Sequence, residues 1–273
     1  MNPFGSRTVN VLPNLKFVPM NLKFAPNLTI NAFNGDHDSR SSPRRSAQRR
    51  PGQRPPVWRD QMSRASCFAL GSAFTVGSVY ARSRYLRWGA TAEDVQIALP
   101  GDGLLRRCDV SATRAISIAV PPVAVWPWLV QLGQGRGGFY SYDSLENLFG
   151  LNIHSAANVV PEWQSLDIGS AVDFAPGVGL RVAELQPQQA LVLRGGLPIA
   201  GPSPYDFTWA FVLRPGPGEG TRLIVRERYA YLSWWAPLMV EPVEVVSFVM
   251  SQKMLRGIRD RAEHAAAAAE LVL

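Results

Sequence analysis

Alternating apolar and polar positions predict a series of β-strands in the second half of the chain. In Arg222–Ala230 every second residue is apolar or is Glu227, and three of the positions between them are arginines. A period of two indicates a strand whose two faces meet different surroundings. Shorter runs of similar character are separated by Gly and Pro, which mark turns. The predicted strands are Ala112–Val120, Ala171–Phe174, Leu180–Leu185, Ala190–Arg194, Asp206–Leu213 and Arg222–Ala230.

A longer period predicts one amphipathic helix near the C-terminus, from Glu241 to about Ala268. Apolar residues recur there every three or four positions, which places them on one face of a helix. We expect that face to pack against the sheet. Its members are Val243, Val246, Met250, Met254, Ile258 and Ala262.

Two shorter helices are predicted between the first two strands. One begins at Pro121-Pro122, because proline is tolerated in the first turn, and Pro127 is expected to kink it or keep its start irregular. The other is Ser144–Phe149, with Asp143 as the N-cap residue and Glu146 as its capping-box partner. The two acids also resemble a paired-carboxylate site, but the capping role accounts for both of them.

The order of these elements predicts an α+β fold. A strand and two helical pieces precede an antiparallel meander, and one long helix follows the meander. A curved antiparallel sheet wrapped around a long C-terminal helix buries the apolar faces of both elements and tends to leave a cavity between them. We therefore expect one domain over residues 86–270, with a ligand-binding cavity between its sheet and its last helix.

The positive charge of the chain is confined to its N-terminal part. The net charge is +7, but residues 1–64 hold 11 Lys or Arg against 3 Asp or Glu, and residues 65–273 hold 17 against 18. A neutral domain offers no footprint for a phosphate backbone, so we do not expect the domain to bind nucleic acid. Residues 1–60 are predicted to be a disordered basic tail. That tail is either without structure of its own, an extension upstream of a start near Met62, or a basic arm that contacts anionic lipid or nucleic acid.

An uncharged run of 17 residues, Ala65–Ala81, follows the basic tail. As a helix it would be ~25 Å long, slightly short of the ~30 Å hydrocarbon core of a bilayer. Residues 63–82 are therefore a candidate transmembrane or signal-like helix. If this helix spans the membrane, the protein is membrane-anchored, and the arginines before the helix place the N-terminus in the cytoplasm. The alternative is a helix packed on a cytoplasmic domain.

Several segments of the chain together match a family pattern. They are RWGAT at Arg87–Thr91, Ala115–Val120, PPVAVWPWLVQLGQGRGGFYSYDSLENLFG at Pro121–Gly150, PEWQ at Pro161–Gln164 and EPVEVVSFVMSQKMLRGIRDRAE at Glu241–Glu263. These segments resemble the SRPBCC superfamily, whose START-like, helix-grip fold includes polyketide cyclase/dehydrase-type and lipid-transfer proteins. The resemblance covers roughly Arg87–Ala265 and implies a helix-grip fold. It implies no catalytic residue, because the superfamily has none in common and contains both carriers and enzymes.

Gly133, Gly135 and Gly138 spell G-x-G-x-x-G, which is also the pattern of a dinucleotide-binding loop. That reading needs a strand before the glycines, a helix that starts at them and a βαβ unit around them. Here a predicted helix precedes the glycines, and an aromatic segment follows. We interpret them as a flexible or tightly turned loop at the cavity entrance, where glycine allows close backbone approach.

Glu227 is the sharpest candidate for a polar contact with a ligand. It shares its strand face with apolar residues, and an acid in such a place needs a partner or acquires a raised pKa. It could orient a ligand hydroxyl, act as a general acid/base, or pair with Arg136 or Arg194. Arg136 could itself anchor an anionic or carbonyl group, or be a surface residue on a loop.

Aromatic and flexible side chains complete the expected ligand site. Tyr140 and Tyr142 combine apolar surface with a hydroxyl group, although packing under the glycine loop explains them equally well. Trp209 and Phe211 are at positions expected for the core or the cavity wall. Met250 lies on the apolar face of the last helix.

No metal or cofactor is implied by the sequence. Cys67 and Cys108 have no partner at zinc spacing, and the three histidines are scattered. The leading hypothesis is binding of a hydrophobic or amphipathic small molecule in the cavity, as a carrier or sensor. One alternative is a cyclase/dehydrase-type enzyme with Glu227 as acid/base. Another is a membrane-tethered interaction module, which would show a plugged cavity beside an exposed apolar patch.

Overall fold

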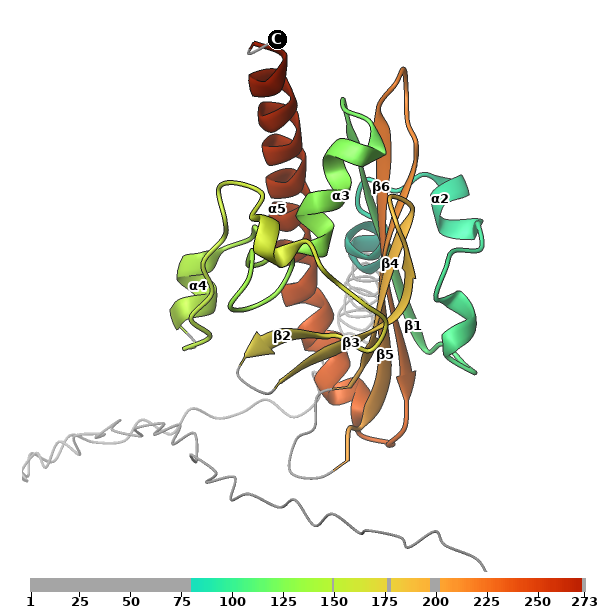
Figure 1. Ribbon diagram of the computed structural model, residues 1–273. Coiled ribbons are helices and arrows are strands. Elements are labelled where there is room, and N and C mark those ends of the chain that lie inside the picture. Colours follow the sequence, from blue (N-terminus) through green and yellow to red (C-terminus); the bar gives the residue numbers. More distant parts are fainter. Residues whose placement is uncertain (1–79, 149, 176–177, 197–201, 272–273) are drawn as a thin grey trace, which may run out of the picture. The chain divides into compact units, whose positions relative to one another are not determined.

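A six-stranded antiparallel sheet lies at the centre of the protein in the computed structural model, which describes residues 80–148, 150–175, 178–196 and 202–271 (Figure 1). The spatial order is β1-β6-β5-β4-β3-β2, so the first strand of the sheet lies beside the last. The strands are β1 (Val110–Ile118), β2 (Ala171–Ala175), β3 (Val178–Gln186), β4 (Ala190–Gly195), β5 (Tyr205–Pro215) and β6 (Thr221–Tyr231). All six predicted strands are confirmed, and their ends differ from the predicted ones by two residues or fewer.

Two irregularities bend the half of the sheet that contains β2, β3 and β4. The pairing register shifts between Asp173 and Ala175 on β2, and between Val182 and Glu184 on β3. Bulges of this kind bend the strand and increase its local twist. The sheet therefore curls toward the side on which its long helix lies (Figure 1).

That helix, α5 (Ala236–Glu270), runs along one face of the sheet with α3 (Pro122–Val130) beside it. The α+β helix-grip arrangement expected from the sequence is confirmed by this packing. Helix α5 begins five residues before the predicted start at Glu241, because Pro237 falls in its first turn, where a missing N–H is harmless. Two short helical pieces, α4 (Asp143–Leu148) and η2 (Pro161–Trp163), lie between α3 and β2.

The buried face of α5 differs from the predicted face in the first half of the helix. Near the C-terminus the expected residues are buried in the main apolar core. Near the start, Val243 and Val246 are 41% and 58% exposed, whereas Glu244 and Ser251 are buried. The predicted apolar stripe is therefore wrong in this half, because the sheet presents a charged partner there instead of an apolar surface.

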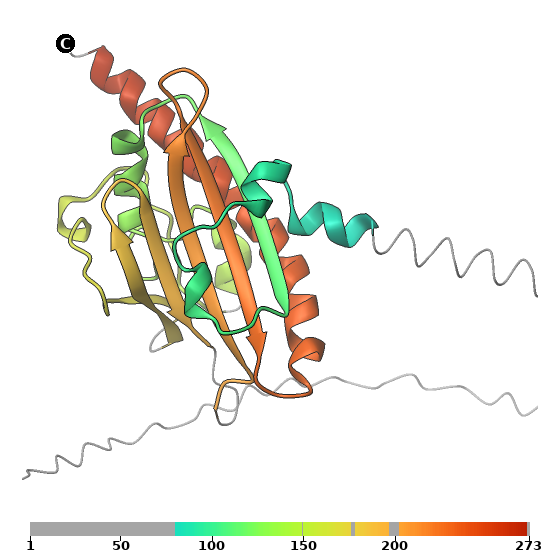
Figure 2. The same ribbon diagram turned by 90° about the vertical axis from the view of Figure 1, so that its right-hand side faces the viewer.

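Residues 80–86, which are helical, pack against α5, where Arg82 forms an ion pair with Glu241 and Tyr85 contacts Phe248. The opposite face of the sheet is covered by the chain that continues from there to β1, which contains α2 (Ala92–Gln96) and the 3-10 turn η1 (Asp102–Leu104) (Figure 2). A second apolar cluster is buried beneath this segment. Arg226 lies on the face of β6 that carries the three arginines, and it is only 5% exposed because this segment covers it.

The expectations for the N-terminal part fall largely outside the described residues. Those for residues 1–60, and for all but the last two residues of Ala65–Ala81, concern positions before residue 80. In the part of the chain that the structure describes, no helix is both long enough and apolar enough to cross a membrane.

Candidate functional site

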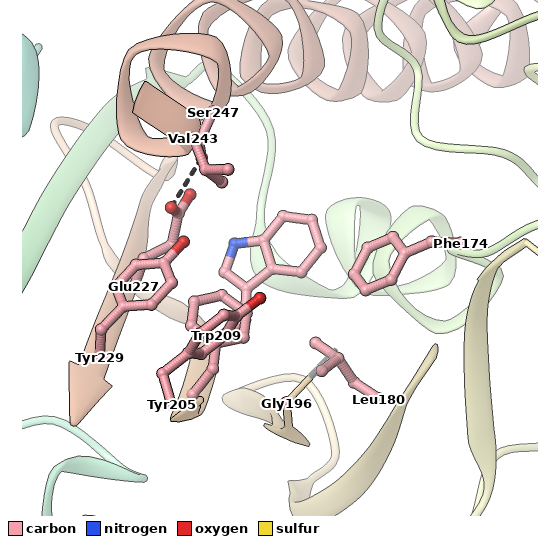
Figure 3. Close-up of a pocket in the computed structure, with 10 residues that line it drawn as sticks. Phe174, Leu180, Gly196, Tyr205, Trp209, Glu227, Tyr229, Val243 and Ser247 are labelled. Atoms are coloured by element: carbon pink, nitrogen blue, oxygen red, sulfur yellow. Dashed lines mark hydrogen bonds between the residues drawn. The ribbon is translucent and has the colours of Figure 1, made fainter. Parts of the chain in front are cut away.

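An apolar cavity lies between the sheet and α5 and consists of two chambers. The first has a volume of about 190 Å³ and is drawn in Figure 3, and the second has a volume of about 220 Å³. Phe174, Trp209 and Ser247 line both chambers. The other residues of the first chamber are Leu180, Gly196, Tyr205, Phe207, Glu227, Tyr229 and Val243. The other residues of the second chamber are Phe139, Ser141, Glu146, Leu151, Ile153, Met250, Ser251 and Met254.

Strand register brings the walls of the first chamber together. Trp209 on β5 is directly opposite Glu227 on β6, and Phe207 is opposite Tyr229. Directly opposed residues of an antiparallel pair share one face of the sheet, so all four side chains point toward α5. The ring of Phe174 stacks on Trp209 with their centroids 5.9 Å apart. This aromatic pair forms the partition between the two chambers.

Glu227 is held by a buried arginine that was not among its predicted partners. Arg114 on β1 donates from Nη1 to Oε1 of Glu227 at 2.8 Å, and from Nη2 to Oε2 of Glu244 at 3.0 Å. Ser247 donates to Oε2 of Glu227 at 2.7 Å (Figure 3), and Ser251 donates to its Oε1 at 3.1 Å. A strand cation, a strand acid and an acid with two hydroxyls from α5 thus form one buried cluster.

The acids and the cation of this cluster are unequal in number. Two carboxyl groups share one guanidinium, and Oε1 of Glu244 has no hydrogen-bond partner among the residues that the structure describes. Burial and the negative charge of Glu227 raise the pKa of Glu244 to about 8, against the opposing effect of Arg114. Glu244 therefore holds a proton at neutral pH. In the described ranges no group of three or more His, Cys, Asp or Glu side chains is placed to hold a metal ion.

The second chamber has a buried acid of its own, Glu146 on α4. Its Oε1 accepts a hydrogen bond from the hydroxyl of Ser141, whereas Oε2 has no partner within the described part of the chain. Glu146 is 6% exposed, and burial raises the pKa of its carboxyl group. It is the one charged side chain among the residues that line this chamber.

The predicted capping box at α4 is wrong. The helix begins at Asp143, one residue earlier than predicted, so Asp143 lies inside the helix and not at its cap. Its carboxylate accepts hydrogen bonds from the backbone N–H and the hydroxyl of Ser155, at 2.7 and 2.6 Å. Glu146 is thereby left to face the second chamber.

Trp209 carries an unused donor at the partition. Its Nε1 is buried and has no hydrogen-bond partner in the described residues. In Figure 3 the indole nitrogen lies on the side of the ring toward Glu227 and Tyr229. A buried donor without an acceptor costs about 1–3 kcal/mol, which an acceptor on a bound molecule would recover.

The predicted ligand residues divide into two groups. Glu227 and Trp209 line the first chamber, and Trp209 and Met250 line the second. The remaining predicted residues line neither chamber: Arg136, Tyr140, Tyr142 and Phe211.

The expected pairing of Glu227 with Arg136 or Arg194 is wrong. Arg136 donates to the backbone carbonyl of Trp163 at 2.6 Å, and Arg194 forms an ion pair with Asp206 at 2.7 Å. Neither arginine faces Glu227, because Arg114 occupies that position.

The tyrosines and Phe211 have structural surroundings. The hydroxyl of Tyr140 donates to the carbonyl of Trp128 at 3.1 Å and accepts from Gln131, so Tyr140 is fixed beneath the glycine loop. Phe211 is fully buried in the apolar core, and Tyr142 is largely on the surface. Contact of these residues with a ligand stays a prediction.

The glycine loop forms a closed turn. Gly133 and Gly138 exchange backbone hydrogen bonds at 3.0 Å, and the N–H of Gln134 donates to the carbonyl of Asp173 at 2.7 Å. All three motif glycines have positive φ, and a Cβ on Gly138 would lie 2.8 Å from the carbonyl oxygen of His154. These amides donate to carbonyls of the turn itself and of β2, in contrast to a phosphate-binding loop, where they face the ligand. Phe139, which follows, lines the second chamber.

Arg114, Glu244 and Glu146 are charged site residues that the sequence pattern did not identify as such. Arg114 is a charged residue on an otherwise apolar face of β1, which is the same signal that singled out Glu227 on β6. Pairing the two strands next to each other, as the chain order of a helix-grip fold implies, would have brought these opposite charges together.

Comparisons with known proteins give matches among solved structures alone. No family model and no curated protein matches the sequence. DynU16, a protein from the dynemicin biosynthetic locus, is 16% identical with a TM-score of 0.33, and the alignment covers 54% of this chain but only 46% of DynU16. MLL2253 from Mesorhizobium loti is 15% identical with a TM-score of 0.35, covering 55% and 96% of the two chains. The Polyketide_cyc-like protein Cgl2372 from Corynebacterium glutamicum is 12% identical with a TM-score of 0.33, covering 57% and 91%.

All three TM-scores are below 0.5. The fold assignment rests on the chain itself: β1 lies beside β6 at one edge of the sheet, and α5 packs along the face of the same sheet. That arrangement is the helix-grip fold expected from the sequence.

Proposed function

We propose that the protein binds a hydrophobic or amphipathic small molecule in the two-chamber cavity, as a carrier or sensor. The observation that carries the proposal is an apolar cavity with an unused buried donor, Nε1 of Trp209, at its partition. Together the chambers reach the size range of small-molecule sites, ~300–1,000 Å³. A mostly apolar wall with a few polar atoms matches a ligand that has an apolar body and a polar group.

The contacts of Glu227 favour binding over acid/base catalysis. Arg114, Ser247 and Ser251 all donate to its two carboxylate oxygens. A general base needs a lone pair directed at the proton that it removes. The alternative function, a cyclase/dehydrase-type enzyme, predicts that Glu227→Gln abolishes turnover and leaves ligand binding largely intact.

The proposal is tested with the full chain by native mass spectrometry and by titration with 1-octanol. We expect a co-purifying small molecule or saturable binding of octanol. Two matched pairs of variants locate the site. In the first pair, Val243→Trp fills the first chamber, whereas Val246→Trp adds the same side chain outside it. In the second pair, Met250→Trp fills the second chamber, whereas Val249→Trp does not. Each cavity-filling variant should weaken binding tenfold or more relative to its partner. Equal effects within both pairs would contradict the proposal.

A second candidate function, contact with a membrane surface, is favoured by one observation. Exposed apolar side chains gather at the turn before α5 and in its first turns, where Leu232, Trp234 and Leu238 are 65%, 89% and 76% exposed. Exposed apolar patches mark interaction sites. Sedimentation of the full chain with phosphatidylcholine vesicles tests this function. If the protein contacts membranes, the wild-type protein should sediment with the vesicles. The double variant Trp234→Ser, Leu238→Ser should lose this binding, and Val243→Trp should retain it.

A further inference from the structure

The two chambers differ in whether the carboxyl group that lines them is paired with a cation. Glu227 in the first chamber is paired with Arg114 at 2.8 Å. Glu146 in the second is nine-tenths buried, and its hydrogen bond from Ser141 is to a neutral hydroxyl. No Lys, Arg or His lines the second chamber among the described residues, and Glu146 forms no ion pair with any of them.

An uncompensated carboxyl group in apolar surroundings is unfavourable in its charged form. Taking a carboxylate out of water costs several kcal/mol unless a cation is brought with it. Asp143 carries a charge of the same sign, which adds to the effect of burial in raising the pKa of Glu146. The free Oε2 of Glu146 therefore lacks both a donor and a counter-ion.

We propose that the second chamber binds the ammonium group of a lipophilic amine, with Glu146 as its counter-ion. The inference rests on the proposed function and names the class of ligand. An ammonium group supplies the hydrogen-bond donor and the positive charge that Oε2 lacks. A charge-assisted bond of this kind is roughly twice as strong as a neutral one.

The other groups of the chamber suit an alkylammonium ion. The hydroxyl of Ser141 donates its hydrogen to Glu146, so the lone pairs of its oxygen can accept a hydrogen bond from an ammonium group beside the carboxylate. Phe139 and Phe174 stack on each other with their centroids 5.2 Å apart, and ring faces attract cations. Met250 and Met254 supply apolar surface for the hydrocarbon part.

Other ligand chemistries fit the chamber less well. A fatty carboxylate would add a second negative charge beside Glu146 and Asp143. A neutral alcohol could donate one hydrogen bond to Oε2 but would leave its charge uncompensated. For ligands with hydrocarbon chains of equal length, the structure therefore predicts that the amine binds most tightly, the alcohol less tightly and the carboxylate least tightly.

The test compares n-octylamine, 1-octanol and octanoate as probes of the full chain at pH 7, with binding measured by titration calorimetry. We expect octylamine to bind at least tenfold more tightly than octanol in the wild-type protein. In Glu146→Gln, octylamine binding should weaken at least tenfold more than octanol binding, because glutamine keeps an acceptor oxygen but loses the charge. Glu162→Gln removes the same charge from an exposed position and should change neither.

Retained octanol binding shows that Glu146→Gln is folded, and circular dichroism provides a second check. If octanol binds but octylamine binds no tighter, or if Glu146→Gln leaves octylamine binding unchanged, the inference is overturned and the proposed function stands. If Val243→Trp abolishes octylamine binding and Met250→Trp does not, the amine lies in the first chamber and the inference is also overturned. If no probe binds saturably, both the inference and the proposed function fail.

Discussion

Arg226 and Arg114 are buried arginines on neighbouring strands, but they lie on opposite faces of the sheet and have different partners. Arg226 on β6 faces the segment that precedes β1. Its Nε donates to the hydroxyl of Thr113 at 3.0 Å, and one of its Nη1 bonds reaches the carbonyl of Ile97 at 2.9 Å. Its other donors bond to the carboxylate of Asp102 and to the carbonyls of Asp94 and Val95 at the end of α2.

Arg114 on β1 faces the cavity, and two of its hydrogen bonds go to carboxyl groups, against one for Arg226. The two bonds reach Glu227 and Glu244, while Nε donates to the carbonyl of Tyr85 at 3.2 Å. The cluster contains one acid more than it has cations, and one oxygen of Glu244 remains without a partner among the described residues.

The difference separates a structural arginine from one that belongs to a site. The five N–H groups of Arg226 are matched by five acceptors, four of them uncharged, and the cluster fastens α2 and η1 to the sheet. The cluster of Arg114 is unbalanced next to a cavity, so its protonation and hydrogen bonding can respond to what the cavity contains. Burial alone does not distinguish the two residues; the titratable second acid, Glu244, and its unpartnered oxygen do.

The largest effect is expected from Arg114→Met. It leaves Glu227 and Glu244 buried without a cation, and breaking a buried pair in this way costs about 3–5 kcal/mol. Urea unfolding at pH 8 measures the loss. The triple variant Arg114→Met, Glu227→Gln, Glu244→Gln should recover most of it, because no buried charge remains. A triple variant as unstable as the single one would contradict the charge argument.

Arg226→Met should cost less, about 3 kcal/mol, because Asp102 is partly exposed and can be hydrated when its partner is removed. The lost bonds to the carbonyls of α2 should also raise hydrogen exchange in residues 92–104. Most of these acceptors do not titrate, so the cost should be the same at pH 6 and pH 8. A cost that changes strongly with pH would show that the two arginine clusters are more alike than their contacts indicate.

Glu244 makes the cavity-side cluster sensitive to pH. Its pKa is about 8 in the folded protein, against 4.5 for an unperturbed glutamate, so the folded state binds more protons than the unfolded state between these values. The contribution of Glu244 to stability is therefore present below pH 4.5 and is lost as the pH rises through about 8. Glu244→Gln should remove this slope, which amounts to a few kcal/mol across the range.

Urea unfolding of wild type and Glu244→Gln at pH 5, 7 and 9 measures the difference. The variant should gain in relative stability as the pH rises. Parallel pH profiles would mean that Glu244 is ionised in the folded protein throughout. Arg226→Met serves as the reference variant, since its cluster lies on the other face.

The sequence predicted the sheet well and the cavity-side cluster poorly, for one physical reason. Strand periodicity is local, so β6 and its acid Glu227 were visible in nine residues of sequence. The buried face of α5 is decided by Arg114, which is 130 positions away from Glu244 in the chain. Without that partner, the exposed Val246 is a better candidate for the core than Glu244, and a pattern based on hydropathy selects the wrong stripe.

Glu146 shows a second limit of sequence patterns. An acid three residues after Asp143 fits a capping box, and local spacing cannot reveal that Ser155 takes the carboxylate of Asp143. The acid that faces the second chamber was therefore assigned a structural role. The Asp143–Ser155 contact is made by a loop that folds back on the helix, and that contact depends on tertiary structure.

The smallest and most discriminating comparison is between Thr113→Val and Ser251→Ala, which delete one hydroxyl from each cluster. Thr113 is the acceptor of the Nε proton of Arg226, so its loss leaves a charged buried donor unsatisfied and should cost about 1–3 kcal/mol. Ser251 shares Oε1 of Glu227 with Arg114, and its loss leaves Glu227 bound, so the cost should be about 0.5–1.5 kcal/mol. Midpoints of urea unfolding measure both. A larger cost for Ser251→Ala would mean that the hydrogen bonds of the cavity-side cluster are as tightly matched as those of the structural one, and hydrogen-bond mismatch would then no longer mark it as a site.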